Sequence, residues 1–122
     1  MDKQILKKEY HKNGAIKSEG LLKDRQPEGL HVTYYETGNV FKEEYYLNGK
    51  LDGQSRIYYP SGELKQLRNY KDGMLEGTCS QYYLNGRVLF EIEYEKGKVI
   101  KIIKYSADGG EESVEHYLSS GR

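Results

Sequence analysis

The stretch Gly53-Gln-Ser-Arg-Ile-Tyr-Tyr-Pro-Ser-Gly62 decides how this chain folds. Its tyrosine pair recurs 24 residues earlier as Tyr34-Tyr35 and 24 residues later as Tyr82-Tyr83. Three sets of glycines keep the same interval, namely Gly38, Gly62 and Gly86, then Gly49, Gly73 and Gly97, then Gly29, Gly53 and Gly77. A fixed period of this size indicates a repeat architecture.

The period divides the chain into copies of one unit. We expect a single repeat domain over residues 1–122, with a degraded first copy at 5–28, full copies at 29–52, 53–76 and 77–100, and a capping copy at 101–122. In the last copy Tyr105 and Tyr117 continue the pattern with one residue missing. Irregular end copies are typical of repeat arrays, because the terminal units cap them.

The composition disfavours a compact globule. Hydrophobic residues make up 36% of the chain, and that share includes 13 tyrosines. An aliphatic core is therefore hard to build, and cross-strand contacts between half-buried tyrosines are the expected alternative. The mean hydropathy of −0.89 would also suit disorder, but the tyrosine content and the strict period argue against it.

Each copy reads as two strands and two glycine-centred turns. Pro60 favours the first central position of a type I turn, which leaves Gly62 for the left-handed bulge of a three-residue hairpin loop. We expect the same loop at both sets of turns, with glycines Gly14, Gly38, Gly49, Gly62, Gly73, Gly86 and Gly97. The predicted fold class is all-β: a single-layer, twisted antiparallel meander of repeated β-hairpins, open and elongated, with roughly ten strands.

This turn choice predicts which residues share a face of the sheet. With Gly62 in the bulge, Tyr58 opposes Leu64, and alternation places Tyr70 on the same face. We therefore expect one structural tyrosine ladder, made of Tyr10, Tyr34, Tyr58, Tyr82, Tyr105, Tyr46, Tyr70 and Tyr94. The opposite, more solvated face is expected to carry the candidate partner-binding residues Tyr35, Tyr59 and Tyr83, a stripe with the composition of an interaction hot spot.

Residues that could carry chemistry are scattered through the copies. A metal or acid–base site needs side chains that converge, whereas the three histidines lie in three different copies, as His11, His31 and His116. Cys79 is the single cysteine, which excludes an intramolecular disulfide and a cysteine-pair metal site. We expect no enzymatic activity, no catalytic residue, no cofactor and no metal.

One acidic position recurs in the repeat. Glu19, Glu43 and Glu91 occupy it, and Leu67 replaces the acid in the remaining copy. A recurring acid can bind a basic partner, but pairing across strands with Lys or Arg is the favoured interpretation.

Charge and hydropathy limit the partners and the location. Nineteen basic and nineteen acidic residues are interspersed, so no nucleic acid is expected. No apolar run is long enough for an integral membrane segment, and the first residues are too polar for a signal peptide. The expected location is the cytoplasm, with a removed signal or lipid anchor as the alternative.

The spacing Tyr-Tyr-x-x-Gly followed by Glu, Tyr and Gly resembles the MORN repeat, most closely its bacterial variant form. The most regular stretches are Gly53–Gly62 and Gly77–Gly86. The resemblance implies an extended β-sheet that serves as a protein-interaction or membrane-apposition module, and similar small bacterial proteins are labelled YwqK-type antitoxins. The repeats also flank phosphatidylinositol-phosphate kinase domains, but this chain has no glycine-rich phosphate loop, so a kinase activity is rejected.

The expected function is therefore a non-catalytic repeat module for protein–protein interaction, as a scaffold or in an antitoxin-like role. Its partner is an unidentified protein or a second copy of the chain. The alternative is a peripheral module that binds anionic phospholipid weakly. The balanced charge disfavours this alternative, because polybasic clusters normally supply such affinity.

Overall fold

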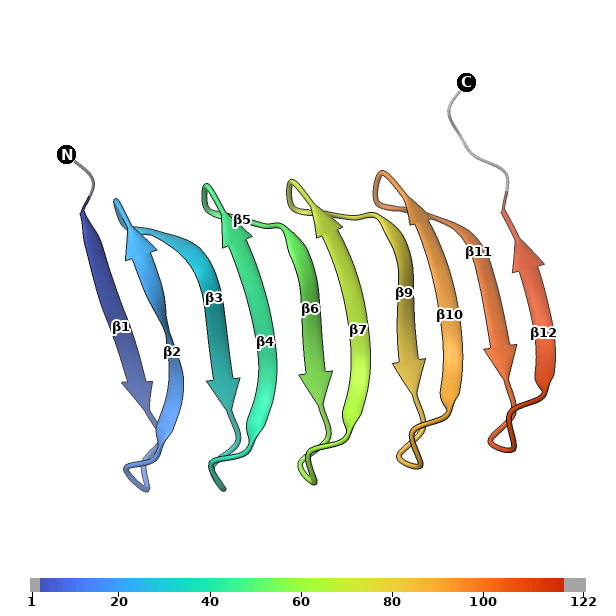
Figure 1. Ribbon diagram of the computed structural model, residues 1–122, viewed down its shortest axis with the longest axis horizontal. Helices are drawn as coiled ribbons and strands as arrows, with labels where there is room; N and C mark the ends of the chain where they lie inside the picture. The colour runs from blue at the N-terminus through green and yellow to red at the C-terminus, as the bar shows by residue number, and fades with distance from the viewer. Residues whose placement is uncertain (1–2, 118–122) are drawn as a thin grey trace.

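The computed structural model describes residues 3–117 as one open antiparallel sheet (Figure 1). The hydrogen-bonded path runs in meander order, β1-β2-β3-β4-β6-β7-β9-β10-β11-β12, while β5 pairs with β4 and β8 with β7. No helix occurs among the described residues, which confirms the predicted all-β meander. The bounds are β1 Gln4–Tyr10, β2 Ile16–Lys23, β3 Gln26–Tyr34, β4 Val40–Leu47, β5 Lys50–Leu51, β6 Gly53–Tyr58, β7 Leu64–Lys71, β8 Met74–Leu75, β9 Gly77–Tyr82, β10 Val88–Glu95, β11 Lys98–Tyr105 and β12 Glu111–His116.

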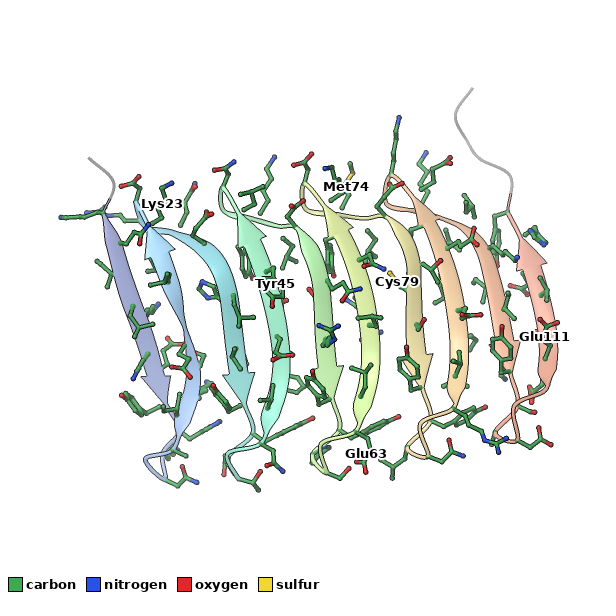
Figure 2. All side chains as sticks on the ribbon, viewed as in Figure 1. Lys23, Tyr45, Glu63, Met74, Cys79 and Glu111 are labelled. Atoms are coloured by element: carbon green, nitrogen blue, oxygen red, sulfur yellow. The ribbon has the colours of Figure 1, made fainter. Side chains whose placement is uncertain are left out.

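The sheet has no packed core beneath it. Side chains project from both faces of the single layer (Figure 2). Cys79, 5% exposed, is the one buried hydrophobic residue among residues 3–117, and no large side chain there is fully buried. Contacts between neighbouring hairpins must therefore supply most of the stabilisation.

The turns that follow the tyrosine pairs have the predicted loop. The Gly62 amide donates to the Tyr59 carbonyl at 2.9 Å, and the Tyr59 amide donates to the Glu63 carbonyl at 2.8 Å. Gly62 has a φ of 106°, the left-handed bulge position. This is a type I turn closed by a glycine bulge, as Pro60 indicates.

The second set of turns differs from the prediction. Asn48 and Gly49 have φ values of 53° and 81°, and Leu47 pairs directly with Lys50. Positive φ at both central residues defines a two-residue type I′ turn, so the expected three-residue loop is wrong here. The physical reason is local: Asn and Asp tolerate the left-handed region, and these turns carry no proline to hold φ negative.

The third glycine set marks a break in the strand pairing. Tyr46 of β4 opposes Leu51 of β5, but Lys42 of β4 opposes Ile57 of β6. The β5–β6 segment therefore has two more residues than β4 over this stretch, around Gly53, whose φ is 100°. At the end of the array Tyr94 opposes Val99 and Glu93 opposes Lys101, which leaves one extra residue. The residue missing from the last copy is therefore lost at this bulge.

Carboxylates join neighbouring copies at the type I′ edge of the sheet. In each turn, the backbone amide of the first central residue donates to an acidic side chain of the preceding copy. This acidic residue directly precedes Gly29, Gly53 or Gly77 in the sequence. The pairs are Asn48 to Glu28 at 3.0 Å, Asp72 to Asp52 at 3.1 Å and Lys96 to Glu76 at 2.8 Å. These bonds satisfy a turn amide that the two-residue loop leaves outside the strand pairing.

A second bulge decides the faces of the sheet. Tyr58 opposes Leu64 as predicted, but Ile57 opposes Gln66, so Lys65 is an extra residue in its strand. An extra residue reverses the alternation, which separates Tyr58 from Tyr70. The expectation of one shared tyrosine ladder is therefore wrong.

The two faces can now be defined by their residues. The glutamate face carries Glu19, Glu43 and Glu91 with the first tyrosines, Tyr10, Tyr34, Tyr58, Tyr82 and Tyr105. The cysteine face carries Cys79 with the second tyrosines, Tyr35, Tyr59 and Tyr83, and with Tyr46, Tyr70 and Tyr94.

Candidate functional site

The first tyrosine of each pair donates its hydroxyl to the glutamate of the preceding copy. The bonds are Tyr34 to Glu19 at 2.6 Å, Tyr58 to Glu43 at 2.7 Å and Tyr105 to Glu91 at 2.6 Å. The recurring acids thus accept from tyrosine hydroxyls. Lys8 and Arg56 do stand across the strands from Glu19 and Glu43, as expected, but the hydrogen bonds of these carboxylates come from tyrosine. Leu67 fills the acidic position facing Tyr82 and offers no acceptor.

These carboxylates change the acidity of the tyrosines. The hydrogen bond to Glu19 is the main cause that raises the pKa of Tyr34 to about 12, and the bond to Glu91 does the same for Tyr105. For Tyr58, burial is the larger cause and the bond to Glu43 the second. A phenolate beside a carboxylate is disfavoured, so these hydroxyls stay protonated as donors.

The second tyrosine of each pair donates to the backbone of the following copy. Its acceptor is the carbonyl of the next first tyrosine: Tyr35 to Tyr58 at 2.5 Å, Tyr59 to Tyr82 at 2.6 Å and Tyr83 to Tyr105 at 2.8 Å. His11 fills the same position in the first copy, and its Nε2 lies 2.9 Å from the Tyr34 carbonyl. The second tyrosines therefore link adjacent hairpins by hydrogen bonds.

We call Tyr35, Tyr59 and Tyr83 the tyrosine stripe. All three are half-buried, so each ring keeps an accessible part. The Tyr35 ring lies 5.0 Å from the ring of Phe41, centroid to centroid, and Lys65 Nζ lies 5.7 Å from the centroid of Tyr59. The stripe is thus an aromatic surface with one tyrosine ring in each of three copies, and a lysine lies near the ring of Tyr59.

The remaining tyrosines of the cysteine face surround small residues. The ring of Tyr46 meets His31 edge-on at 5.1 Å, and Arg68 Nη1 donates to the Tyr70 hydroxyl at 3.2 Å. Ser55 and Cys79, both 5% exposed, lie at equivalent positions on this face. Tyr46, Tyr70 and Tyr94 therefore have a packing role.

Cys79, His11 and His31 make separate contacts in the part of the chain that the structure describes. Burial raises the pKa of the Cys79 thiol, which makes it a poor nucleophile at neutral pH. His31 donates from Nε2 to the Leu21 carbonyl at 2.7 Å, far along the chain from the contact of His11. Within residues 3–117 no three His, Cys, Asp or Glu side chains are grouped to hold a metal ion.

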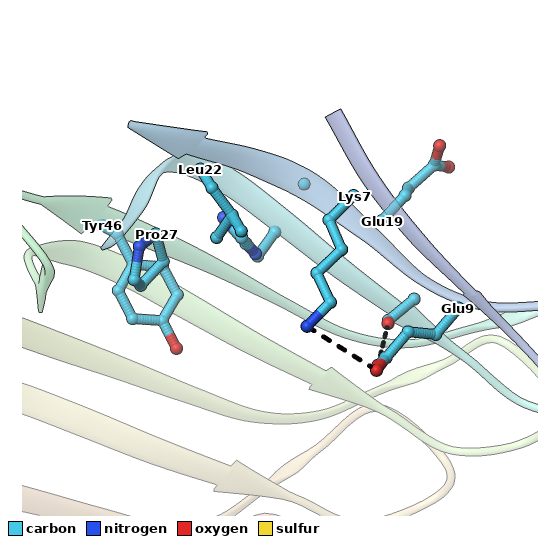
Figure 3. A pocket seen from close by; sticks show the side chains of 9 residues that line it. Lys7, Glu9, Glu19, Leu22, Pro27 and Tyr46 are labelled. Carbon is cyan, nitrogen blue, oxygen red and sulfur yellow. Dashed lines mark hydrogen bonds and ion pairs between the residues drawn. The ribbon is translucent and has the colours of Figure 1, made fainter. Parts of the chain in front are cut away.

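A hollow lies at the N-terminal end of the cysteine face, with a volume of about 250 Å³ (Figure 3). Gly20 and His31 both line it, and the His31 ring occupies the space that a Cβ on Gly20 would take, at a position that a side chain fills in later copies. Lys7 Nζ approaches Glu9 at 3.8 Å, and Ser18 donates to Glu9 at 3.0 Å. The polar groups of this hollow thus have partners already.

Sequence reasoning missed an exposed set of apolar side chains on the glutamate face. We call it the apolar row: it crosses β1 to β4 as Leu6, Leu21, Leu30 and Tyr45, which are 55%, 41%, 42% and 42% exposed. The equivalent positions in later copies are polar, at Gln54, Asn69, Thr78 and Glu93. The row departs from the repeat, so the features that the copies share do not indicate it.

The sheet and its recurring contacts define an open, single-layer β-repeat protein. Residues 3–24, 27–48, 51–72 and 75–96 match the family model of the MORN repeat variant, with successive matches starting 24 residues apart. The chain belongs to the MORN repeat variant family. No curated protein matches it. The part of the chain that the structure describes contains no helix long and apolar enough to cross a membrane.

Proposed function

We propose that this chain is a non-catalytic module that binds another protein through the tyrosine stripe. The observation that carries the proposal is the bond from each stripe hydroxyl to a backbone carbonyl of the next copy. These bonds hold the three rings in fixed orientations. Rings that are already immobilised lose little conformational entropy when a partner docks on them.

The spacing of the rings suggests the partner. Stripe residues of successive copies lie two strands apart, which corresponds to about 10 Å. A polyproline II helix repeats every three residues over roughly 9 Å, and such helices dock on aromatic surfaces. We infer that the stripe takes an extended, proline-rich segment that crosses the strands, with one residue in three on a ring.

The test is titration with a peptide that carries proline at every third position, followed by tyrosine fluorescence and calorimetry. Tyr59→Ser removes a central ring and should abolish binding. Tyr59→Phe keeps the ring and should bind, although its melting temperature falls because the hydroxyl bond is lost. Tyr58→Phe on the glutamate face is the matched control, with a similar loss of stability and unchanged binding. Binding that survives Tyr59→Ser contradicts the assignment.

A second candidate is peripheral binding to anionic lipid, and the apolar row favours it. Residues 1–25 carry seven basic and four acidic side chains, and Leu6 and Leu21 are exposed in the same region. Exposed apolar side chains beside an excess of positive charge suit an anionic membrane surface. In sedimentation with phosphatidylserine vesicles, Leu21→Ser should reduce co-pelleting, whereas Leu84→Ser in an exposed turn should not. An absence of co-pelleting removes this candidate.

A further inference from the structure

The two ends of the sheet are open strands with opposite charge. Every residue of β1 and of β12 is exposed, and each strand pairs on one side only (Figure 1). β1 carries Lys7 and Lys8 with one acid, Glu9, whereas β12 carries Glu111, Glu112 and Glu115 with no base. Residues 105–117 contain no Lys or Arg, in contrast to the basic excess of residues 1–25.

We propose that copies of this chain associate head to tail, with β12 of one copy paired to β1 of the next. This junction repeats one that the sheet already makes four times, where β2 meets β3, β4 meets β6, β7 meets β9 and β10 meets β11. It uses the strand edges and not the tyrosine stripe, so it is independent of the proposed function.

The repeat predicts the register of this junction. At the internal junctions Glu43 opposes Arg56, and Leu67 opposes Ser80. Val114 occupies the same repeat position as Glu43 and Leu67. Lys8 occupies the same repeat position as Val32, Arg56 and Ser80, which follow it at intervals of 24 residues. Val114 therefore meets Lys8 of the next copy, and Glu115 meets Lys7.

The charges select this pairing over the symmetric ones. Two β12 edges would bring glutamates together, which is unfavourable, and two β1 edges would pair strands that both carry a net positive charge. The head-to-tail junction instead places Glu115 directly across from Lys7. The edge charges thus disfavour pairing of β1 with β1 and of β12 with β12. They favour pairing of β12 with β1, which continues the repeat.

The junction lacks two of the hydrogen bonds found between internal copies. Ser106 stands where Tyr35, Tyr59 and Tyr83 donate to the following copy, and it is too short to reach. Val114 stands where a glutamate accepts from the next first tyrosine. The association is therefore weak and reversible. Because its two surfaces differ, it does not close, and it forms a series that lengthens with concentration.

Sedimentation velocity over a roughly thousandfold concentration range tests the proposal at low salt. The weight-average mass should rise past that of a dimer and fall when salt is added. Lys7→Glu and Glu115→Lys should each weaken association by roughly fivefold, and the double variant should restore it. A monomer at all concentrations, a dimer that does not grow, or a double variant that fails to recover overturns the proposal.

A gain-of-function variant provides the second arm. Ser106→Tyr supplies the missing donor toward the Tyr10 carbonyl of the next copy and should tighten association by roughly fivefold. Thr37→Tyr, in an exposed turn away from both edges, is the control and should leave association unchanged. Equal effects of the two substitutions contradict the assigned register. Tyr59→Ser, which tests the tyrosine stripe, should leave the mass distribution unchanged.

Discussion

Two adjacent tyrosines of identical chemistry have different partners because their side chains leave opposite faces of the sheet. Tyr58 donates to the Glu43 carboxylate of the copy before it, and Tyr59 donates to the Tyr82 carbonyl of the copy after it. Each pair therefore links its own hairpin to both neighbours. The sequence indicated that the two positions differ, but not which acceptor either one meets.

The tyrosine–glutamate bonds should make stability fall at alkaline pH. The pKa of Tyr34 rises from 10.0 to about 12 on folding, so its contribution is complete below pH 10 and is lost as the pH passes about 12. Urea unfolding of the wild type and of Tyr34→Phe across this window measures the effect. The difference in unfolding free energy between the two should shrink as the pH rises. A constant difference contradicts the linkage.

The copy that lacks its glutamate can be repaired. Leu67→Glu places an acceptor within reach of Tyr82 and directly across from Arg56, so we expect a gain of about 0.5–1.5 kcal/mol in unfolding free energy. Chemical denaturation measures this gain. The same substitution in a Tyr82→Phe background is the control, since most of the gain should disappear there. An equal gain in both backgrounds would falsify the role given to Tyr82.

At the scale of the hairpin, two kinds of turn alternate along each copy. Pro60 made the first kind predictable, because proline fixes φ at the first central position. The second kind has no proline, and its loop is one residue shorter than the shared glycines suggest. Only the direct pairing of Leu47 with Lys50 shows that its loop has two residues. In the first copy the same turn is Asp24-Arg25, with φ values of 51° and 71°, and no glycine marks it.

The type I′ turn at Lys96 should be open to improvement. Lys96 has a φ of 49°, a region that costs a lysine about 1 kcal/mol. Lys96→Asn should therefore raise the free energy of unfolding by several tenths of a kcal/mol or more, because asparagine tolerates this conformation. Thermal and urea unfolding check the prediction. Ser61→Asn, in a turn of the other kind, has no such strain to relieve and should be close to neutral.

At the scale of the whole molecule, stability comes from neighbouring copies and not from a common core. The main contacts of each hairpin are with the hairpins beside it, as in other repeat proteins, where stability is approximately a sum of local terms. The described end strands β1 and β12 have one neighbour each, while strands such as β6 and β7 lie inside the array.

Hydrogen exchange should reveal this arrangement as a gradient. Backbone amides of β6 and β7 should exchange most slowly, and those of β1 and β12 fastest, because an end strand opens without breaking a second junction. Exchange followed by mass spectrometry at a concentration where the chain is monomeric measures it. Uniform protection from β1 to β12 would indicate a single cooperative unit and contradict the nearest-neighbour description.

The sequence by itself determined the period, the antiparallel meander and the loop at Pro60, because each depends on local spacing and on backbone preferences. Only the tertiary structure decided which face Tyr58 and Tyr70 occupy, since one extra residue, Lys65, reverses the alternation. It also decided that Glu43 accepts from Tyr58 and that Tyr59 donates to Tyr82, because these partners come from different copies. The period shows that the copies recur, whereas only their packing shows which hydrogen bonds one copy makes with the next.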